Sequence, residues 1–347
     1  MDYDFELLRE LTETSGVPGY EDRVRELVCR EFEGAVDSVE TDAMGNVVGT
    51  IEGESDYSVA VAAHMDEIGF MVRHVTEDGF LAVDPLGGWD PEVLRAQRVT
   101  VHAAEEDLTG VIGSIPTHVQ DDDEGGLSVE DVTVDLGLPV EEVEERVAVG
   151  DLVSMDQTTE LMGDAVTGKA LDDRVCLFAM LEAAGRIENP DVTVHFCATV
   201  QEELGVRGAP AVSVDVDPDL AVALDVTVAN DIPAVEDEAD YVTELGGGAA
   251  IKLKDSSVVT TPKVHRRMRA VAEDRDIPHQ TEILPSGATD TAGFQNTHGA
   301  KPVGAISVPT RYLHTVTETV HREDLAATID LLTAFLETET GEHDYAL

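Results

Sequence analysis

Acidic and histidine side chains follow or close apolar runs at five places in the sequence. These places are His64-Met65-Asp66 after VAVAA, Asp172-Asp173 ahead of a helical run, Glu202-Glu203 after VTVHFCATVQ, Asp225 closing AVALD, and His314 after AISVPTRYL. In an open α/β sheet, polar groups at the carboxyl ends of strands line a crevice. One ligand from each place gives two imidazoles and three carboxylates, which suit zinc, cobalt or manganese. The pattern therefore predicts a metal site.

The number of candidate ligands fits a pair of ions. Two divalent ions ~3.5–4 Å apart need one bridging carboxylate and further ligands on each side. We expect Asp172 to bridge, with His64 and Asp225 on one ion and Glu203 and His314 on the other. The assignment of each terminal ligand to an ion is left open. Zinc is the expected metal, with cobalt and manganese as alternatives.

Two further acids have predicted roles beside the metals. Asp66 lies two residues after His64, where its carboxylate can accept the imidazole N–H and fix the tautomer. Glu202 adjoins Glu203 and can act as general base, taking a proton from a metal-activated water and passing it to the leaving amine. His195 lies in the middle of an apolar run, so we interpret it as a core histidine. The sequence thus favours metal-dependent hydrolysis of an amide bond.

The elements that position these residues alternate between strands and helices. We predict strands at 46–51, 57–63, 192–200, 219–226 and 305–310, and helices that include 172–186, 264–273 and 323–337. This alternation predicts an α/β fold with a mostly parallel central sheet flanked by helices. We assign residues 1–66 and 157–347 to this catalytic domain. The acidic C-terminal run ETETGEHDYAL is predicted to be frayed.

Residues 67–156 show a different sequence pattern from the regions on either side. Short strand-like runs recur there between Gly, Asp and Pro residues, which is typical of a small β-rich domain. An acidic loop at 121–126 and a short helix at 140–147 are expected on its surface. We interpret this region as an insertion into the α/β domain.

The composition excludes several classes of partner. The 347 residues carry 22 Lys and Arg against 72 Asp and Glu, a formal net charge of −50. Such a charge argues against binding nucleic acid or an anionic membrane. With 42% hydrophobic residues the chain can nevertheless fold. The start lacks the pattern of a signal peptide, so we expect a cytoplasmic protein, and the excess of carboxylates over lysines predicts a halophilic source.

Six ordered segments resemble the M42 family of metallo-aminopeptidases, of the tetrahedral (TET) type. They are AAHMDEIGF (62–70), GKALDDRV (168–175), VQEELGVRGA (200–209), ALDVTVANDIP (223–233), PSGATDTAGF (285–294) and PTRYLHTVTE (309–318). The resemblance implies a dinuclear metallopeptidase fold with an inserted β-barrel, PDZ-like dimerisation domain at 67–156. It also implies a homo-oligomeric dodecamer that removes N-terminal residues from short peptides.

Each proposed site residue matches the family's motif at its own position. By this resemblance His64, Asp172, Glu203, Asp225 and His314 are metal ligands, Glu202 is the catalytic base and Asp66 orients the histidine. A carboxypeptidase or amidohydrolase on the same dinuclear site is the enzymatic alternative. A binding scaffold without catalysis is a second alternative, but no ligand and no base is missing from the sequence.

Overall fold

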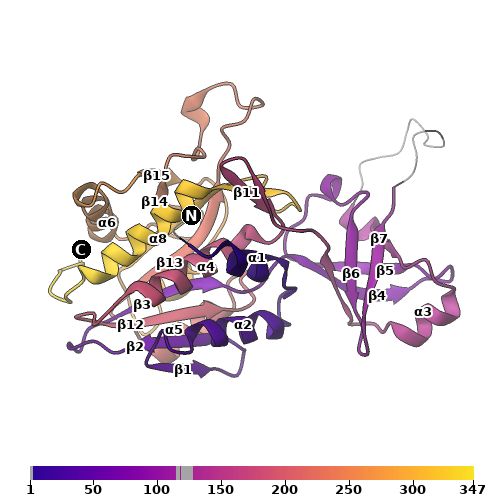
Figure 1. The fold of residues 1–347 in the computed structure, drawn as a ribbon, viewed down its shortest axis with the longest axis horizontal. Coiled ribbons are helices and arrows are strands. Elements are labelled where there is room, and N and C mark those ends of the chain that lie inside the picture. The colour runs from indigo at the N-terminus through magenta and orange to yellow at the C-terminus, as the bar shows by residue number, and fades with distance from the viewer. Residues whose placement is uncertain (1–2, 115–117, 119–127) are drawn as a thin grey trace.

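Four parallel strands form the centre of an eleven-stranded sheet in the computed structural model, which describes residues 3–114, 118 and 128–347 (Figure 1). In sheet order they are β12 (Thr193–Thr199), β3 (Ser58–His64), β13 (Leu220–Val228) and β16 (Val303–Arg311). They are rich in Val and Ala and are buried along almost their whole length, as expected of parallel strands covered on both faces.

The outer strands of this sheet are largely antiparallel. One side adds β2 (Val47–Ile51) and β1 (Ser38–Thr41), and the other adds β17 (Glu318–His321), β11 (Ala165–Gly168) and β10 (Glu160–Met162). β14 (Ala249–Lys254) pairs antiparallel with β16 and parallel with β15 (His279–Ile283). The sheet is therefore mixed, and the predicted parallel arrangement describes its four central strands.

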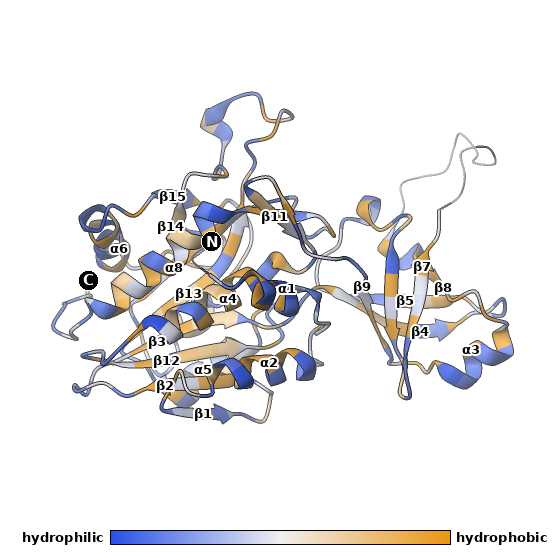
Figure 2. Cartoon of the chain, viewed as in Figure 1, coloured by the Kyte–Doolittle hydropathy of each residue, from blue (hydrophilic) through white to orange (hydrophobic). Residues whose placement is uncertain are grey.

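Helices cover both faces of the sheet. On one face lie α4 (Leu171–Arg186), α6 (Pro262–Asp274) and α8 (Arg322–Glu337), with α1 (Phe5–Glu13) and α2 (Asp22–Phe32) packed on α4. The opposite face carries α5 (Gly208–Val216) and α7 (Thr291–Gln295). Figure 2 shows hydrophobic residues concentrated in the sheet and hydrophilic ones on the outer helix surfaces. No helix in the described part of the chain is long and apolar enough to cross a membrane.

A separate six-stranded closed barrel lies beside the sheet (Figure 1). Around the barrel the strands are β4 (Gly69–Val75), β5 (Leu81–Leu86), β8 (Thr133–Asp135), β7 (Asp107–Ile112), β6 (Arg98–His102) and β9 (Leu152–Met155). The barrel has its own hydrophobic core, and α3 (Val140–Arg146) packs at its outer end. Three short 3₁₀ helices complete the described elements: η1 (Pro91–Val93), η2 (Val129–Asp131) and η3 (Glu238–Asp240). The acidic loop predicted at 121–126 lies outside the described residues, and the domain boundaries stay a prediction.

The C-terminal segment packs against the protein, so the prediction that it is frayed was wrong. Glu339 is fully buried and accepts hydrogen bonds from the backbone N–H groups of Thr340 and Gly341. The Tyr345 hydroxyl donates to Glu339 Oε2 at 2.5 Å, and its ring is buried. The acidic composition of this segment suggested solvation, but one carboxylate is satisfied internally and anchors the segment.

Candidate metal centre

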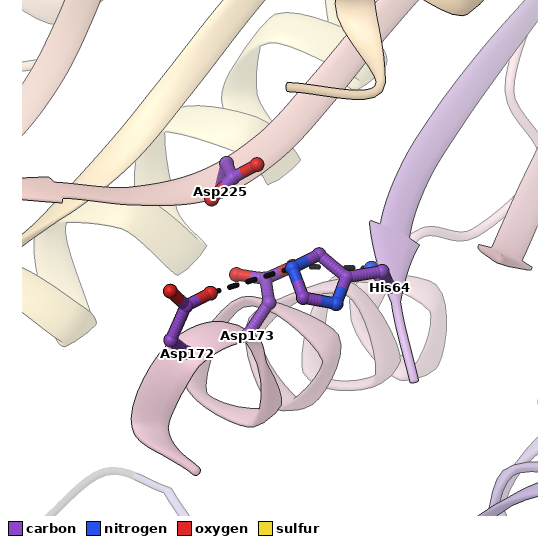
Figure 3. A group of neighbouring side chains, drawn as sticks. All are labelled: His64, Asp172, Asp173 and Asp225. Atoms are coloured by element: carbon purple, nitrogen blue, oxygen red, sulfur yellow. Dashed lines mark hydrogen bonds and ion pairs between the residues drawn. The ribbon is translucent and has the colours of Figure 1, made fainter. Parts of the chain in front are cut away.

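The five predicted ligands come together at the carboxyl-end side of the central strands. His64 is the last residue of β3, Asp225 lies on β13, and Asp172 lies at the start of α4; Figure 3 shows these three side chains facing one another. Glu203 and His314 come from the segments that follow β12 and β16. Their ligand atoms form two groups within 4.8 Å that share Asp172: His64, Asp172, Asp173 and Asp225, and Asp172, Glu203 and His314.

Asp172 lies between the two histidines. Its Oδ1 is 3.3 Å from His64 Nε2, and its Oδ2 is 3.3 Å from His314 Nε2. Glu203 Oε1 lies 3.8 Å from His314 Nε2. Each carboxylate oxygen of Asp172 therefore faces a different imidazole, which is the geometry that a bridging carboxylate requires.

Both imidazoles turn Nδ1 toward a backbone carbonyl. His64 Nδ1 lies 3.1 Å from the carbonyl oxygen of Asp66, and His314 Nδ1 lies 2.7 Å from that of Gly88. A proton on Nδ1 satisfies the carbonyl and leaves the Nε2 lone pair free, as a metal ligand needs. Gly88 follows β5, so a loop of the barrel region reaches the site and orients one of its histidines.

The Asp66 carboxylate is fully buried and fixes the turn that carries both glutamates. Its Oδ1 accepts the backbone N–H of Glu202, and its Oδ2 accepts that of Glu203, both at 3.0 Å. Its Oδ1 also lies 3.5 Å from His64 Nδ1, farther than the Asp66 carbonyl oxygen. The Asp66 carboxylate thus orients the glutamate turn, whereas the nearer acceptor for His64 Nδ1 is the Asp66 backbone carbonyl.

Burial and mutual repulsion disturb the protonation of these groups. Burial and the charge of Asp172 raise the pKa of Glu203 to about 8, and the same two causes raise the pKa of Asp225. Burial lowers the pKa of His314, but the hydrogen bond to Asp172 and the charges of Asp172, Glu203 and Glu318 together outweigh this effect and raise the pKa to about 10. Carboxylates this close in a buried site repel one another, and cations between them relieve that repulsion.

Glu202, the candidate base, lies beside the candidate ligands. Burial raises its pKa well above the ordinary value, and the nearby negative charges of Asp225 and Asp290 raise it further. No hydrogen bond to this carboxylate occurs among residues 3–114, 118 and 128–347. A carboxylate with a raised pKa and no fixed partner can take up a proton and release it again.

Two further acids position backbone groups of the site: Asp173, which the sequence places beside Asp172 but to which no role was assigned, and Glu318, which was not singled out. Asp173 Oδ2 accepts the backbone N–H of His64 at 3.1 Å. Glu318 accepts the backbone N–H groups of Asp172 and His314 at 3.0 and 2.9 Å. The signal for Glu318 was its place four residues after His314, although in so acidic a chain that spacing is weak. His195 is paired with the Thr50 hydroxyl at 2.9 Å, outside both ligand groups.

The sequence matches known aminopeptidases along nearly its whole length. The family model for M42 glutamyl aminopeptidase matches residues 45–331, and a second model, AMPT, matches residues 2–27. The lysyl aminopeptidase of Pyrococcus furiosus is 35% identical over 342 residues, which cover 96% of this chain and 97% of that protein.

Solved structures agree with the sequence match. The aminopeptidase APDkam598 from Desulfurococcus kamchatkensis has a TM-score of 0.93 and 37% identity, over 97% of this chain and 95% of that one. The TET1 peptidase of Pyrococcus horikoshii has a TM-score of 0.87 and 32% identity, over 96% and 99% of the two chains. The chain therefore belongs to the M42 family of TET-type aminopeptidases and is a hydrolase of peptide bonds.

Proposed function

We propose that this aminopeptidase uses two divalent metal ions to remove N-terminal residues from short peptides. The observation that carries the proposal is Asp172, whose two oxygens each face the Nε2 of a different histidine. His64 and Asp225 would hold one ion, and Glu203 and His314 the other. Zinc is the expected metal, with cobalt and manganese as alternatives.

The donor atoms fit such a pair. Imidazole nitrogen and carboxylate oxygen are the ligands that zinc takes, and three clustered carboxylates need positive charge nearby. When bound, the ions would polarise the scissile carbonyl and acidify the attacking water. Glu202 would accept the proton of that water and deliver it to the leaving amine. Asp66 would hold Glu202 and Glu203 at fixed positions through their N–H groups.

Selection of the N-terminus would follow from the charge of the site. A free α-amine is a cation at neutral pH, and acidic side chains of the site that do not bind a metal ion would hold it beside the scissile bond. An acetylated N-terminus lacks that charge. The proposed reaction therefore acts on free N-termini.

The decisive test compares a short peptide with its N-acetylated twin, assayed in molar KCl with added Zn²⁺, Co²⁺ or Mn²⁺. We expect release of the first residue from the free peptide and little cleavage of the acetylated one. Equal rates would instead favour a carboxypeptidase or amidohydrolase on the same metal site.

We also propose that the barrel, within residues 67–156, mediates dimerisation and that dimers assemble into a dodecamer. The Pyrococcus horikoshii TET1 peptidase, which shares this fold, can assemble into a tetrahedron or a large octahedral shell. Light scattering on the purified protein tests this. A mass of twelve subunits is expected, and a stable monomer at micromolar concentration would contradict it.

A further inference from the structure

Glu318 is a buried acid at the start of β17. It is 2% exposed. Its Oε2 accepts the backbone N–H of Asp172 at 3.0 Å, and its Oε1 accepts the backbone N–H of His314 at 2.9 Å. One carboxylate thus joins two segments that are far apart in the sequence.

Both segments need such a partner because their backbones are irregular. Asp172 is non-helical within the first turn of α4, with φ −78° and ψ 106°. His314 has φ 59°, in the left-handed region that non-glycine residues rarely adopt. A buried N–H group without an acceptor is unfavourable, so the Glu318 carboxylate favours these backbone conformations over competing ones.

Asp66 makes the same kind of contact on the other side of the site. Its two oxygens accept the N–H groups of Glu202 and Glu203. Between them, Asp66 and Glu318 therefore hold the backbones of three of the five candidate ligands and of the candidate base. Asp66 holds the segment that carries Glu202 and Glu203, and Glu318 holds the two segments that carry Asp172 and His314.

We propose that Glu318 is a positioning residue that sets the separation of Asp172 and His314 and so controls binding of the ion on the His314 side. This inference rests on the proposed dinuclear site. A glutamine has one acceptor and one donor group, so it can accept only one of the two N–H groups and presents its own NH₂ to the other. Glu318→Gln would release Asp172 or His314 without changing the size of the side chain.

Glu339→Gln is the matched control. Glu339 is also fully buried and also accepts two backbone N–H groups, from Thr340 and Gly341, but it lies in the C-terminal segment. Both variants remove a buried charge by the same isosteric change, but the two N–H groups at Glu339 share Oε1 while Oε2 accepts the Tyr345 hydroxyl, so Glu339→Gln can keep both backbone hydrogen bonds. A general loss of stability should affect both, whereas a change in metal binding should affect only Glu318→Gln.

The test is calorimetric titration of the metal-free proteins with Zn²⁺, together with metal content after dialysis. Replacing a group that orients a metal ligand typically costs 10–100-fold in affinity. We expect Glu318→Gln to bind at least one of the two Zn²⁺ equivalents at least ~10-fold more weakly than wild type does, with excess Zn²⁺ restoring part of the activity. Glu339→Gln should bind both equivalents as wild type does.

Wild-type affinity for both ions in Glu318→Gln would overturn the inference, as would an equal loss in Glu339→Gln. If Glu318→Gln does not fold, Glu318→Asp keeps the charge but is one methylene too short to reach both N–H groups, and the same weakened Zn²⁺ binding is expected. If wild type itself binds fewer than two ions, the proposed function fails instead. The two failures are therefore distinguishable.

Discussion

The central sheet and the barrel bury their strands in opposite ways. β13 is buried at eight consecutive positions from Leu220, whereas β7 alternates exposed and buried residues from end to end. A strand covered on both faces can carry polar side chains only toward its end. The candidate ligands His64 and Asp225 lie in the last part of such strands. The candidate chemistry therefore concentrates at one edge of the sheet, while the exposed positions of β7 face water or the neighbouring elements.

The barrel nevertheless reaches the site through its backbone. The carbonyl oxygen of Gly88 accepts a hydrogen bond from His314 Nδ1, and Arg23 of α2 binds Asp107 of β7 through two hydrogen bonds. Ser15 and Ser154 form a further hydrogen bond across the same junction. The barrel thus helps to position one ligand without supplying a side chain to the chemistry.

The largest effect is expected from Asp172→Asn. The amide cannot supply the negative charge that a bridge between two cations needs, so both ions should bind poorly and turnover should be lost. Metal analysis of the dialysed variant, beside wild type, measures this directly. Retention of two tightly bound ions would exclude Asp172 as the bridge.

Glu202→Gln should separate catalysis from metal binding. Loss of a general base typically costs 10²–10⁴-fold in rate. We expect kcat to fall by about that factor while metal content stays at the wild-type value, because Glu202 is not a proposed ligand. Steady-state kinetics on the metal-loaded variant checks this, and a kcat near that of wild type would refute the assignment of the base.

Shortening one buried leucine in the central sheet and one in the barrel compares the two regions directly. Leu224→Ala on β13 and Leu81→Ala on β5 each remove a buried side chain and should cost ~2–5 kcal/mol of stability. Leu224 precedes Asp225, so its truncation should also weaken Zn²⁺ binding, whereas Leu81→Ala should not. Denaturant unfolding and Zn²⁺ titration test the pair. Equal effects on metal affinity would mean that the two regions are not separable.

Asp107→Asn should have the smallest effect. Hydrogen bonds from Arg23 lower the pKa of Asp107 to about 2, and because the pair is partly exposed its contribution should not exceed ~1 kcal/mol. A lowered folded pKa stabilises the protein above the unfolded value of about 4, and this contribution disappears as the pH falls through 2. The stability difference between wild type and variant should therefore shrink between pH 4 and 2. A difference that grows on acidification would contradict this.

The sequence was informative where residue type and burial pattern coincide. An apolar run followed by His64 or Glu203 is unusual enough to predict a ligand, and runs such as 192–200 predicted the central strands. β14 was not predicted, because its run of apolar residues is short and follows three glycines.

Other features could not be predicted because they depend on contacts between distant segments. Gly88 acts through its carbonyl, which every residue has, so no side-chain pattern reveals it. Glu318 is one of 72 acids, and only the fold shows that it accepts two ligand N–H groups. The buried Glu339 was missed for the same reason, and the C-terminal segment was wrongly predicted to be frayed.

The most direct test of the metal site is anomalous diffraction at the zinc edge from crystals grown with Zn²⁺. Two peaks ~3.5–4 Å apart are expected, with the Asp172 carboxylate between them and His64 and His314 on opposite sides. A single peak, or peaks away from these residues, would contradict it.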